Sequence, residues 1–235
     1  MLNNTNLNEI KEVAKSLLYF DIQLNNEFPF FINYPFSDCN IVTNTNDNTQ
    51  LDLTVEKEMD IFRSIMKKII DESNDYMNIY CRITKPFKAA FLKHTVKYLS
   101  DYDLGKALVN LWKSCDYVNV DLNISRSQYS KLFKKADQSS LMNQDEQEVL
   151  NSLPSIKKLY RGVNNVSNHP IDGMSWTDDI ETAEWFAKRY GGEGKVYSIN
   201  VQKESILAYF QLESEYVVDY AYLKKHKNEI IMVRD

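Results

Sequence analysis

The stretch GMSWTDDIETAEWFAKRYGG, Gly173–Gly192, carries the signals for a short extended segment followed by one helix. Asp178 with Glu181 predicts the start of the helix, because such a pair satisfies amide groups of the first turn. Gly191 and Gly192 predict its end. The residues at helical spacing, which we expect on the core-facing side, are Ala183, Phe186, Ala187 and Tyr190. An amphipathic helix of this length must pack against other elements, and the flanking sequence indicates strands.

The segments on both sides of this helix have strand patterns. IKKLYRGV (156–163) predicts a strand that leads to a glycine turn, and GKVYSINV (194–201) alternates with a period of two. Three further short runs rich in β-branched and aromatic residues are SILAYF (205–210), EYVVDY (215–220) and EIIMVRD (229–235). We therefore expect residues 154–235 to form a compact α+β domain.

Residues 1–153 contain a single glycine, Gly105, and several amphipathic stripes. The stripes are Ile10, Val13, Ala14, Leu17 and Leu18, then Met59, Phe62, Met66, Ile69 and Ile70, then Leu104, Ala107, Leu108, Leu111 and Trp112. Asn143 followed by Glu146 predicts the start of a further helix. The polar stretch SDCNIVTNTNDNTQ (37–50) predicts an exposed loop. The fold class is therefore α+β, with a helical N-terminal domain over 1–153 and a second domain over 154–235.

The composition is that of an ordinary globular chain, with 43% hydrophobic and 26% charged residues. A net charge of −5 gives no sequence-wide attraction to nucleic acid or to an anionic membrane. No apolar run reaches the roughly 20 residues of a membrane span, and the first residues lack the layout of a secretory signal. The cysteines and the histidines (His94, His169 and His226) show no metal-ligand spacing. We expect a cytoplasmic protein that uses no metal.

Three features in the second domain could carry chemistry, and each has a plainer interpretation. Arg161 could bind a phosphate or carboxylate through two hydrogen bonds, or be a surface side chain at a strand end. Ser175 and Thr177 could belong to a catalytic cleft, or serve the start of the helix that follows. Glu213 and Glu215 would share one face of a strand, where repulsion could raise the pKa of one, or where both could be solvated at a sheet edge.

The order of these residues resembles the mono-ADP-ribosyltransferases of the Arg-Ser-Glu class, of bacterial or phage type. The similarity runs through LYRGV (159–163), MSWTDDIETAEWFAKR (174–189), GKVYSINV (194–201) and ESEYVVD (213–219). It covers residues 154–235. The resemblance implies an ADP-ribosyltransferase-like domain built on two packed, antiparallel-rich sheets, preceded by a helical segment.

The resemblance also implies an activity, the transfer of ADP-ribose from NAD⁺ to a macromolecular target. Ser175 would orient Glu215, and Glu215 would stabilise the cationic ribose. Glu213 would position and deprotonate the acceptor, which favours an arginine of a protein. The residues implied to contact NAD⁺ are Arg161, Gly162, Ser175, Thr177 and Glu215, and those implied in catalysis are Arg161, Ser175, Glu213 and Glu215.

Other functions remain open at this point. The chain could modify a nucleic acid, could hydrolyse NAD⁺ as a toxin, or could be an inactive module that binds a nucleotide or a partner. An inhibitor or antitoxin chain could restrain it. One geometric requirement tests the site assignment, because Ser175 Oγ must lie within hydrogen-bond reach of Glu215 if the first orients the second.

Overall fold

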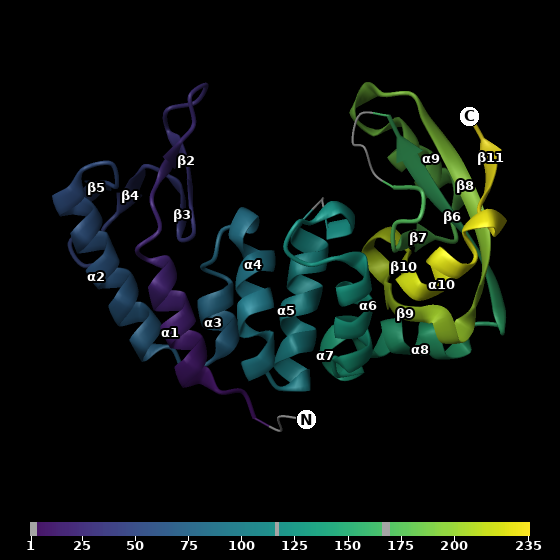
Figure 1. Ribbon diagram of the computed structural model, residues 1–235, viewed down its shortest axis with the longest axis horizontal. Coiled ribbons are helices and arrows are strands. Elements are labelled where there is room, and N and C mark those ends of the chain that lie inside the picture. The colour runs from purple at the N-terminus through teal and green to yellow at the C-terminus, as the bar shows by residue number, and fades with distance from the viewer. Residues whose placement is uncertain (1–3, 116–117, 166–169) are drawn as a thin grey trace. The chain divides into compact units, whose positions relative to one another are not determined.

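The computed structural model describes residues 4–115, 118–165 and 170–235, and the chain divides into two compact units (Figure 1). The first unit comprises Met1–Asp103 and Lys113–Cys115, and the second comprises Leu104–Trp112 and Asp116–Asp235. The α+β class expected from the sequence is confirmed, because helices and antiparallel sheets both occur. The boundary expected at residue 153 lies inside the second unit.

The first unit contains four α-helices within its described residues. They are α1 (Leu7–Leu17), α2 (Glu56–Glu72), α3 (Tyr76–Tyr80) and α4 (Lys85–Thr95). The expected stripes of α1 and α2 form part of the core, since Ile10, Ala14, Met59, Phe62 and Met66 are all buried. These two helices therefore follow directly from the spacing of their apolar residues.

The same unit also has two small sheets that the sequence did not predict. One has the strand order β1 (Gln23–Leu24), β2 (Phe31–Tyr34), β3 (Ser37–Cys39), and the other pairs β4 (Ile41–Thr43) with β5 (Gln50–Asp52). The exposed loop expected over 37–50 is therefore wrong in part. Ile41–Thr43 is a β-branched run that pairs across an Asn-rich turn, and Asn48 adopts a positive φ of 60° there.

Several helices of the second unit precede its sheet in the chain. They are the Leu104–Trp112 part of α5 (Asp101–Ser114), then α6 (Arg126–Lys135), α7 (Gln138–Leu141) and α8 (Gln144–Ser152), with a short 3₁₀ turn η2 (Val118–Val120). The expected start of α8 is confirmed, because Asn143 and Glu146 form a reciprocal capping box. Glu146 also accepts a hydrogen bond from the Gln211 amide at 3.1 Å. Its carboxylate thus ties this helix to the sheet region.

A six-stranded antiparallel sheet forms the centre of the second unit. Its strands are β6 (Ile156–Asn164), β7 (Ser175–Thr177), β8 (Gly194–Gln202), β9 (Ile206–Phe210), β10 (Glu215–Val218) and β11 (Ile231–Arg234), in the order β11-β8-β6-β7-β10-β9. The two packed sheets expected from the resemblance are therefore corrected to one continuous sheet. It consists of two three-stranded halves, and the strands β6 and β7 join them through the single residue pair Tyr160 and Thr177.

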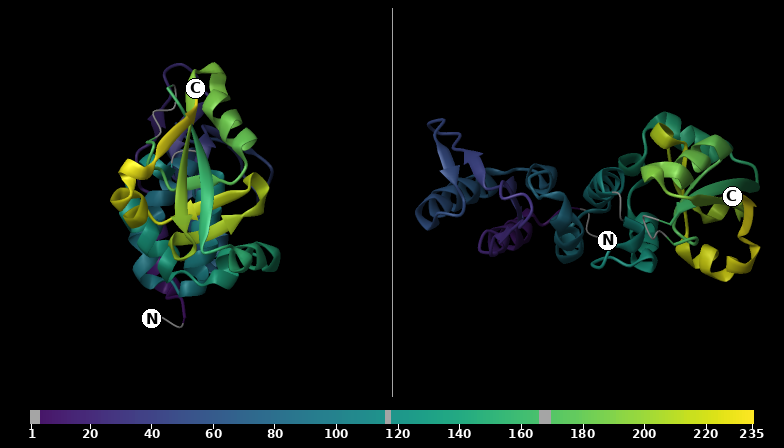
Figure 2. Two further views of the ribbon diagram at one scale, coloured as in Figure 1. Left: turned by 90° about the vertical axis from the view of Figure 1, so that its right-hand side faces the viewer. Right: turned by 90° about the horizontal axis from the view of Figure 1, so that it is seen from above.

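Helix α9 (Ile180–Lys188) packs against β6 and β8, as Figure 2 shows from two directions. Gly162 on β6 allows this close approach, because a Cβ there would lie 1.9 Å from the carbonyl oxygen of Ala183. Ala183 and Ala187 are buried as expected, and the side chain of Tyr190 lies outside the described residues. The remaining helix, α10 (Tyr220–Lys225), follows β10.

The start of α9 differs from expectation by one residue. Asp179, rather than Asp178, is the cap, and its carboxylate accepts from the amides of Glu181 and Thr182. Asp178 instead accepts a hydrogen bond from the Tyr216 hydroxyl at 3.1 Å. Two consecutive aspartates leave the choice to tertiary contacts, and here Tyr216 binds the first of them.

Candidate functional site

The hydroxyl of Ser175 donates a hydrogen bond to Oε1 of Glu215, as the site assignment requires. The two residues lie on neighbouring antiparallel strands, where Glu215 pairs with Thr177 and Val217 pairs with Ser175. Alternate residues of a strand share a face, so Ser175 and Glu215 are diagonal neighbours on the same face. This contact joins residues 40 positions apart in the chain.

Trp112, near the end of α5, donates a second hydrogen bond to the same oxygen of Glu215. The distance from Nε1 to Oε1 is 2.8 Å. The indole is fixed in place by edge-on contacts with Tyr129 and Phe133 of α6, with ring centroids 5.6 and 5.0 Å away. The sequence shows Trp112 only as part of a helical apolar stripe, and no local signal marks it as a partner of a carboxylate.

Glu215 lies in an environment that favours its neutral form. Burial raises the pKa of its carboxyl group, and the hydrogen bonds from Ser175 and Trp112 oppose that rise. The charge of Glu213 raises the pKa further, while the charge of Arg161 lowers it. The net direction is upward. Such a group can titrate closer to neutrality than an exposed glutamate does.

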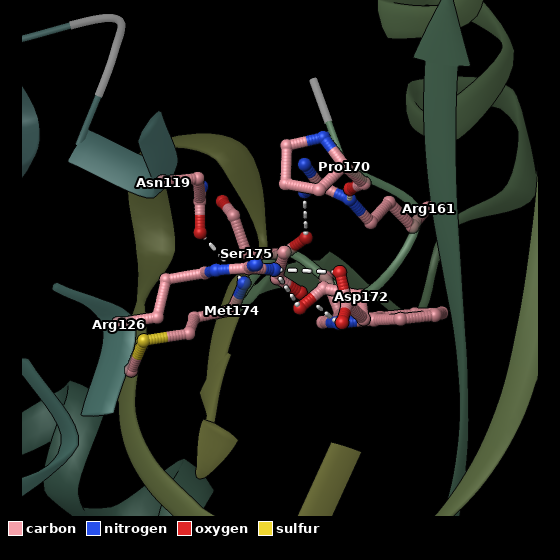
Figure 3. Close-up of polar contacts among 9 residues, drawn as sticks. Asn119, Arg126, Arg161, Pro170, Asp172, Met174 and Ser175 are labelled. Carbon is pink, nitrogen blue, oxygen red and sulfur yellow. Dashed lines mark hydrogen bonds and ion pairs between the residues drawn. The ribbon is translucent and has the colours of Figure 1, made fainter. Parts of the chain in front are cut away.

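Arg161, on β6, is buried with 7% of its surface exposed and holds two backbone carbonyls (Figure 3). Nε donates to the Pro170 oxygen at 3.2 Å, and Nη1 donates to the Ser175 oxygen at 2.6 Å. Burial lowers the pKa of Arg161 to about 10, and the nearby charge of Glu215 acts in the opposite direction. The guanidinium is therefore charged at neutral pH, and it holds the backbone of Ser175 directly.

Gly173 provides the space that this guanidinium occupies. A Cβ at Gly173 would lie 2.4 Å from Nη2 and 2.6 Å from Cζ of Arg161. Any side chain at Gly173 would therefore displace the arginine from its present position. Trp176 Nε1 donates to the Gly173 oxygen at 2.7 Å, so the indole of Trp176 is a buried structural group.

Two residues from the helical part of the same unit hold the segment that leads into β7. Arg126 Nη1 donates to the backbone oxygen of Asp172 at 3.0 Å and forms an ion pair with its carboxylate at 2.6 Å. Asn119 Oδ1 accepts a hydrogen bond from the Met174 amide at 2.7 Å (Figure 3). Sequence reasoning missed both residues, because each acts on a segment at least 46 positions away.

Glu213 differs from its expected placement. It lies in a 3₁₀ turn, η5 (Gln211–Glu213), and Ser214 adopts a left-handed conformation with φ 45° before β10 begins at Glu215. The expectation that a strand aligns both carboxylates on one face is therefore wrong. Glu213 is exposed, yet it is close enough for its charge to raise the pKa of Glu215.

Thr177 and Gly162 both have structural contacts, and for Thr177 the plainer interpretation, that it serves the start of the following helix, is confirmed. The Thr177 hydroxyl accepts a hydrogen bond from the Asp179 amide at 3.2 Å, so Thr177 contributes to the start of α9. Gly162 packs beneath the same helix. The structure thus brings together Arg161, Ser175 and Glu215, while Thr177 and Gly162 both contact α9.

The part of the chain that the structure describes shows neither a metal-ligand cluster nor a membrane-spanning helix. No three His, Cys, Asp or Glu side chains within it gather as metal ligands, and His169 lies outside it. None of its helices is long and apolar enough to cross a membrane. Comparison of the chain with protein-family models, with curated proteins and with solved structures returned no match.

Proposed function

We propose that this chain is an NAD⁺-dependent mono-ADP-ribosyltransferase that acts on a macromolecular target, with protein arginine as the favoured acceptor. The observation that carries the proposal is the hydrogen bond from Ser175 to Glu215. The resemblance to the Arg-Ser-Glu transferases already implies that these two residues interact. Arg161 adds support, because it bonds the backbone of the same serine. NAD⁺ is the second substrate, and the reaction needs no metal.

The chemistry places specific demands on Glu215. When the bond between nicotinamide and ribose breaks, nicotinamide leaves with the electron pair and positive charge develops on the ribose ring. A preorganised carboxylate stabilises that charge most when it is shielded from water. Glu215 is half-buried, and two donors fix its Oε1, so Oε2 is the oxygen that would face the ribose.

Arg161 would anchor a phosphate or ribose oxygen of NAD⁺. Two of its three nitrogens bind backbone carbonyls, and among the described residues Nη2 has no hydrogen-bond partner. Nη2 of the guanidinium would therefore be available to donate a hydrogen bond to NAD⁺. The same residue would thus fix the Ser175 backbone and contact NAD⁺.

Glu213 would act on the acceptor rather than on NAD⁺. It is exposed on the turn that precedes Glu215, where an incoming side chain can reach it. An arginine acceptor must lose a proton as its nitrogen attacks the ribose carbon, and a carboxylate both binds the guanidinium and accepts that proton. This pairing is the reason for favouring arginine over other acceptors.

Incubation of the full chain with adenylate-labelled NAD⁺ and a cell lysate tests the proposal. We expect label on macromolecules that protease releases and nuclease does not. Glu215→Gln should lower transfer by about 100-fold or more. Glu204→Gln is the matched control, because Glu204 is exposed on the η4 turn (Lys203–Ser205) of the same unit.

The other outcomes distinguish the remaining functions. Label released only by nuclease would identify a nucleic-acid target, and free ADP-ribose alone would identify a hydrolase. If NAD⁺ were not consumed, an enzymatic function would be rejected, and the inactive module that binds a nucleotide or a partner would remain. Unchanged transfer by Glu215→Gln would refute the site assignment itself.

A further inference from the structure

The sheet β1-β2-β3 of the first unit exposes an unusual group of apolar side chains. All residues from Gln23 to Phe31 are exposed, and they include Leu24, Phe28, Phe30 and Phe31. The exposed fractions are 59% for Leu24, 56% for Phe28, 72% for Phe30 and 53% for Phe31. Single exposed apolar residues are common, but a cluster of three phenylalanines is typical of an interaction site.

These side chains are presented by a defined local structure. Leu24 on β1 pairs with Ile32 on β2, and Phe31 pairs with Cys39 on β3. Phe28 and Phe31 contact each other edge to face, with ring centroids 6.3 Å apart. We call Glu27, Phe28, Phe30, Phe31 and Asp38 the aromatic surface, and Leu24 is not part of it because its partner Ile32 and the neighbouring Phe31 lie on opposite faces of β2. Its strands are the purple segment labelled β2 and β3 in Figure 1.

The segment that forms the two small sheets carries charged side chains of one sign. From Ser16 to Glu56 the sequence contains no lysine, arginine or histidine, although the whole chain has 28 lysines and arginines. The acidic residues in the same interval are Asp21, Glu27, Asp38, Asp47, Asp52 and Glu56. Arg63 of α2 approaches Tyr19 at the end of α1, and it forms an ion pair with Asp60. The aromatic surface therefore lies in a segment whose charged side chains are all acidic, and we call those side chains its acidic surround.

This combination excludes several occupants on physical grounds. Phosphates of a nucleic acid and headgroups of an anionic membrane are repelled by clustered carboxylates. A symmetric contact with a second copy would place the same acidic surround against itself. The surface therefore suits a partner that carries both apolar and basic side chains. Aromatic rings add to this preference, since their faces attract guanidinium and ammonium groups.

We propose that the aromatic surface binds a basic, apolar segment of a protein partner. That this partner is also the acceptor of ADP-ribose rests on the function proposed above. An acceptor rich in arginine matches both the acidic surround of Phe28, Phe30 and Phe31 and the acceptor chemistry assigned to Glu213. Target recognition and transfer would then use different residues of the chain.

Binding of defined short peptides to the full chain, without NAD⁺, tests the proposal. The probes are a fluorescent peptide that combines leucine with arginine and a matched peptide with glutamate in place of arginine. Anisotropy should show binding of the basic peptide about tenfold tighter or more, and the affinity should fall as salt rises from about 0.05 to about 0.3 M. The double variant Phe28→Ser/Phe30→Ser should weaken binding about tenfold, because aromatic anchors dominate such contacts.

Two further variants keep the result interpretable. The double variant Glu27→Lys/Asp38→Lys leaves the aromatic rings in place. It should weaken binding of the basic peptide and strengthen binding of the acidic one. Leu122→Ser is the matched control, because Leu122 is 99% exposed in the second unit and outside the surface. The affinity of the Leu122→Ser variant for the basic peptide should equal that of the unmodified chain. Near-ultraviolet circular dichroism should show that every variant is folded.

The contrary outcomes are equally defined. Equal binding of both peptides, no binding of either, or tighter binding to phosphatidylserine vesicles or to a single-stranded oligonucleotide would overturn the proposal. Because the assay contains no NAD⁺, it stands apart from the activity. If the chain bound the basic peptide but transferred no ADP-ribose, the proposal for the aromatic surface would stand and the proposed function would be rejected.

Discussion

The indole nitrogen of Trp112 lies 2.8 Å from Oε1 of Glu215, although 103 positions separate the two residues in the chain. The helical segment thus contributes a side chain to the candidate site and does more than precede the sheet. Because Ser175 donates to the same oxygen, the carboxylate is held from two sides. Trp112 is a positioning residue, since it acts on the proposed chemistry through Glu215.

Trp112→Phe should lower NAD⁺ consumption by about tenfold or more, the value of one hydrogen bond to a charged group. The ring remains to pack against Tyr129 and Phe133, so the fold should persist. Loss of a donor that lowers the pKa of Glu215 should also move the acidic limb of the pH–rate profile to higher pH. Trp185→Phe, at a 58% exposed position, should change neither property.

Glu215→Gln should raise the melting temperature at neutral pH while removing activity. The folded-state pKa of Glu215 is raised, so the folded protein binds a proton more readily than the unfolded chain does. Glu215 therefore reduces stability as pH rises from its ordinary pKa through the raised one. Thermal unfolding across this window checks the sign. The stabilisation should shrink as pH falls below the ordinary pKa, and a stability gain that persists unchanged there would contradict the assignment.

Gly173→Ala should cost about 1–3 kcal/mol of stability and most of the activity, because the new methyl group would overlap the Arg161 guanidinium. Denaturant unfolding and NAD⁺ consumption measure the two effects. Gly162→Ala is the comparison, since its methyl group would meet the backbone of α9 rather than Arg161. A Gly173→Ala variant with normal stability and activity would show that Arg161 need not occupy its present position.

Arg126→Ala should destabilise the protein by about 1–3 kcal/mol, since it removes a partly buried ion pair and leaves Asp172 without that partner. A double-mutant cycle with Asp172→Asn measures the coupling between the two side chains. We expect activity to fall together with stability, because Asp172 lies three residues before Ser175. Additive effects of the two substitutions would show that the ion pair contributes nothing.

Glu213→Gln should separate transfer from hydrolysis. Transfer to arginine should fall about 100-fold, because a neutral amide cannot accept the guanidinium proton, whereas NAD⁺ hydrolysis should persist within about twofold. The ratio of labelled protein to free ADP-ribose gives the result. If both activities fell equally, Glu213 would act on Glu215 or NAD⁺ and not on the acceptor.

The sequence predicted those features whose signals are local. The stripe of α1 and the capping box at Asn143 and Glu146 lie within a few residues of the structures that they specify. The contact between Ser175 and Glu215 was expected from the resemblance and not from a local pattern, and the register of β7 with β10 places the two side chains on one face.

The errors arose where tertiary contacts decide. Ser214 turns the chain with a positive φ, which no strand pattern reveals, and it removes Glu213 from the strand. Asp178 and Asp179 are equal candidates for a helix cap until Tyr216 binds the first. Trp112, Asn119 and Arg126 reach their partners across large sequence separations, so a single sequence gives no sign of their roles.

The junction between β6 and β7 has a mechanical consequence for the candidate site. One residue pair, Tyr160 and Thr177, joins the two halves of the sheet, whereas β6 and β8 pair along nine residues. The pair Tyr160–Thr177 is therefore the narrowest backbone connection within the sheet, with Arg161 on one side of it and Glu215 on the other. A small hinge motion along it would change the span between guanidinium and carboxylate while leaving both halves folded. The hydrogen bond from Arg161 to the backbone oxygen of Ser175 crosses the same junction, so it would restrain such a motion.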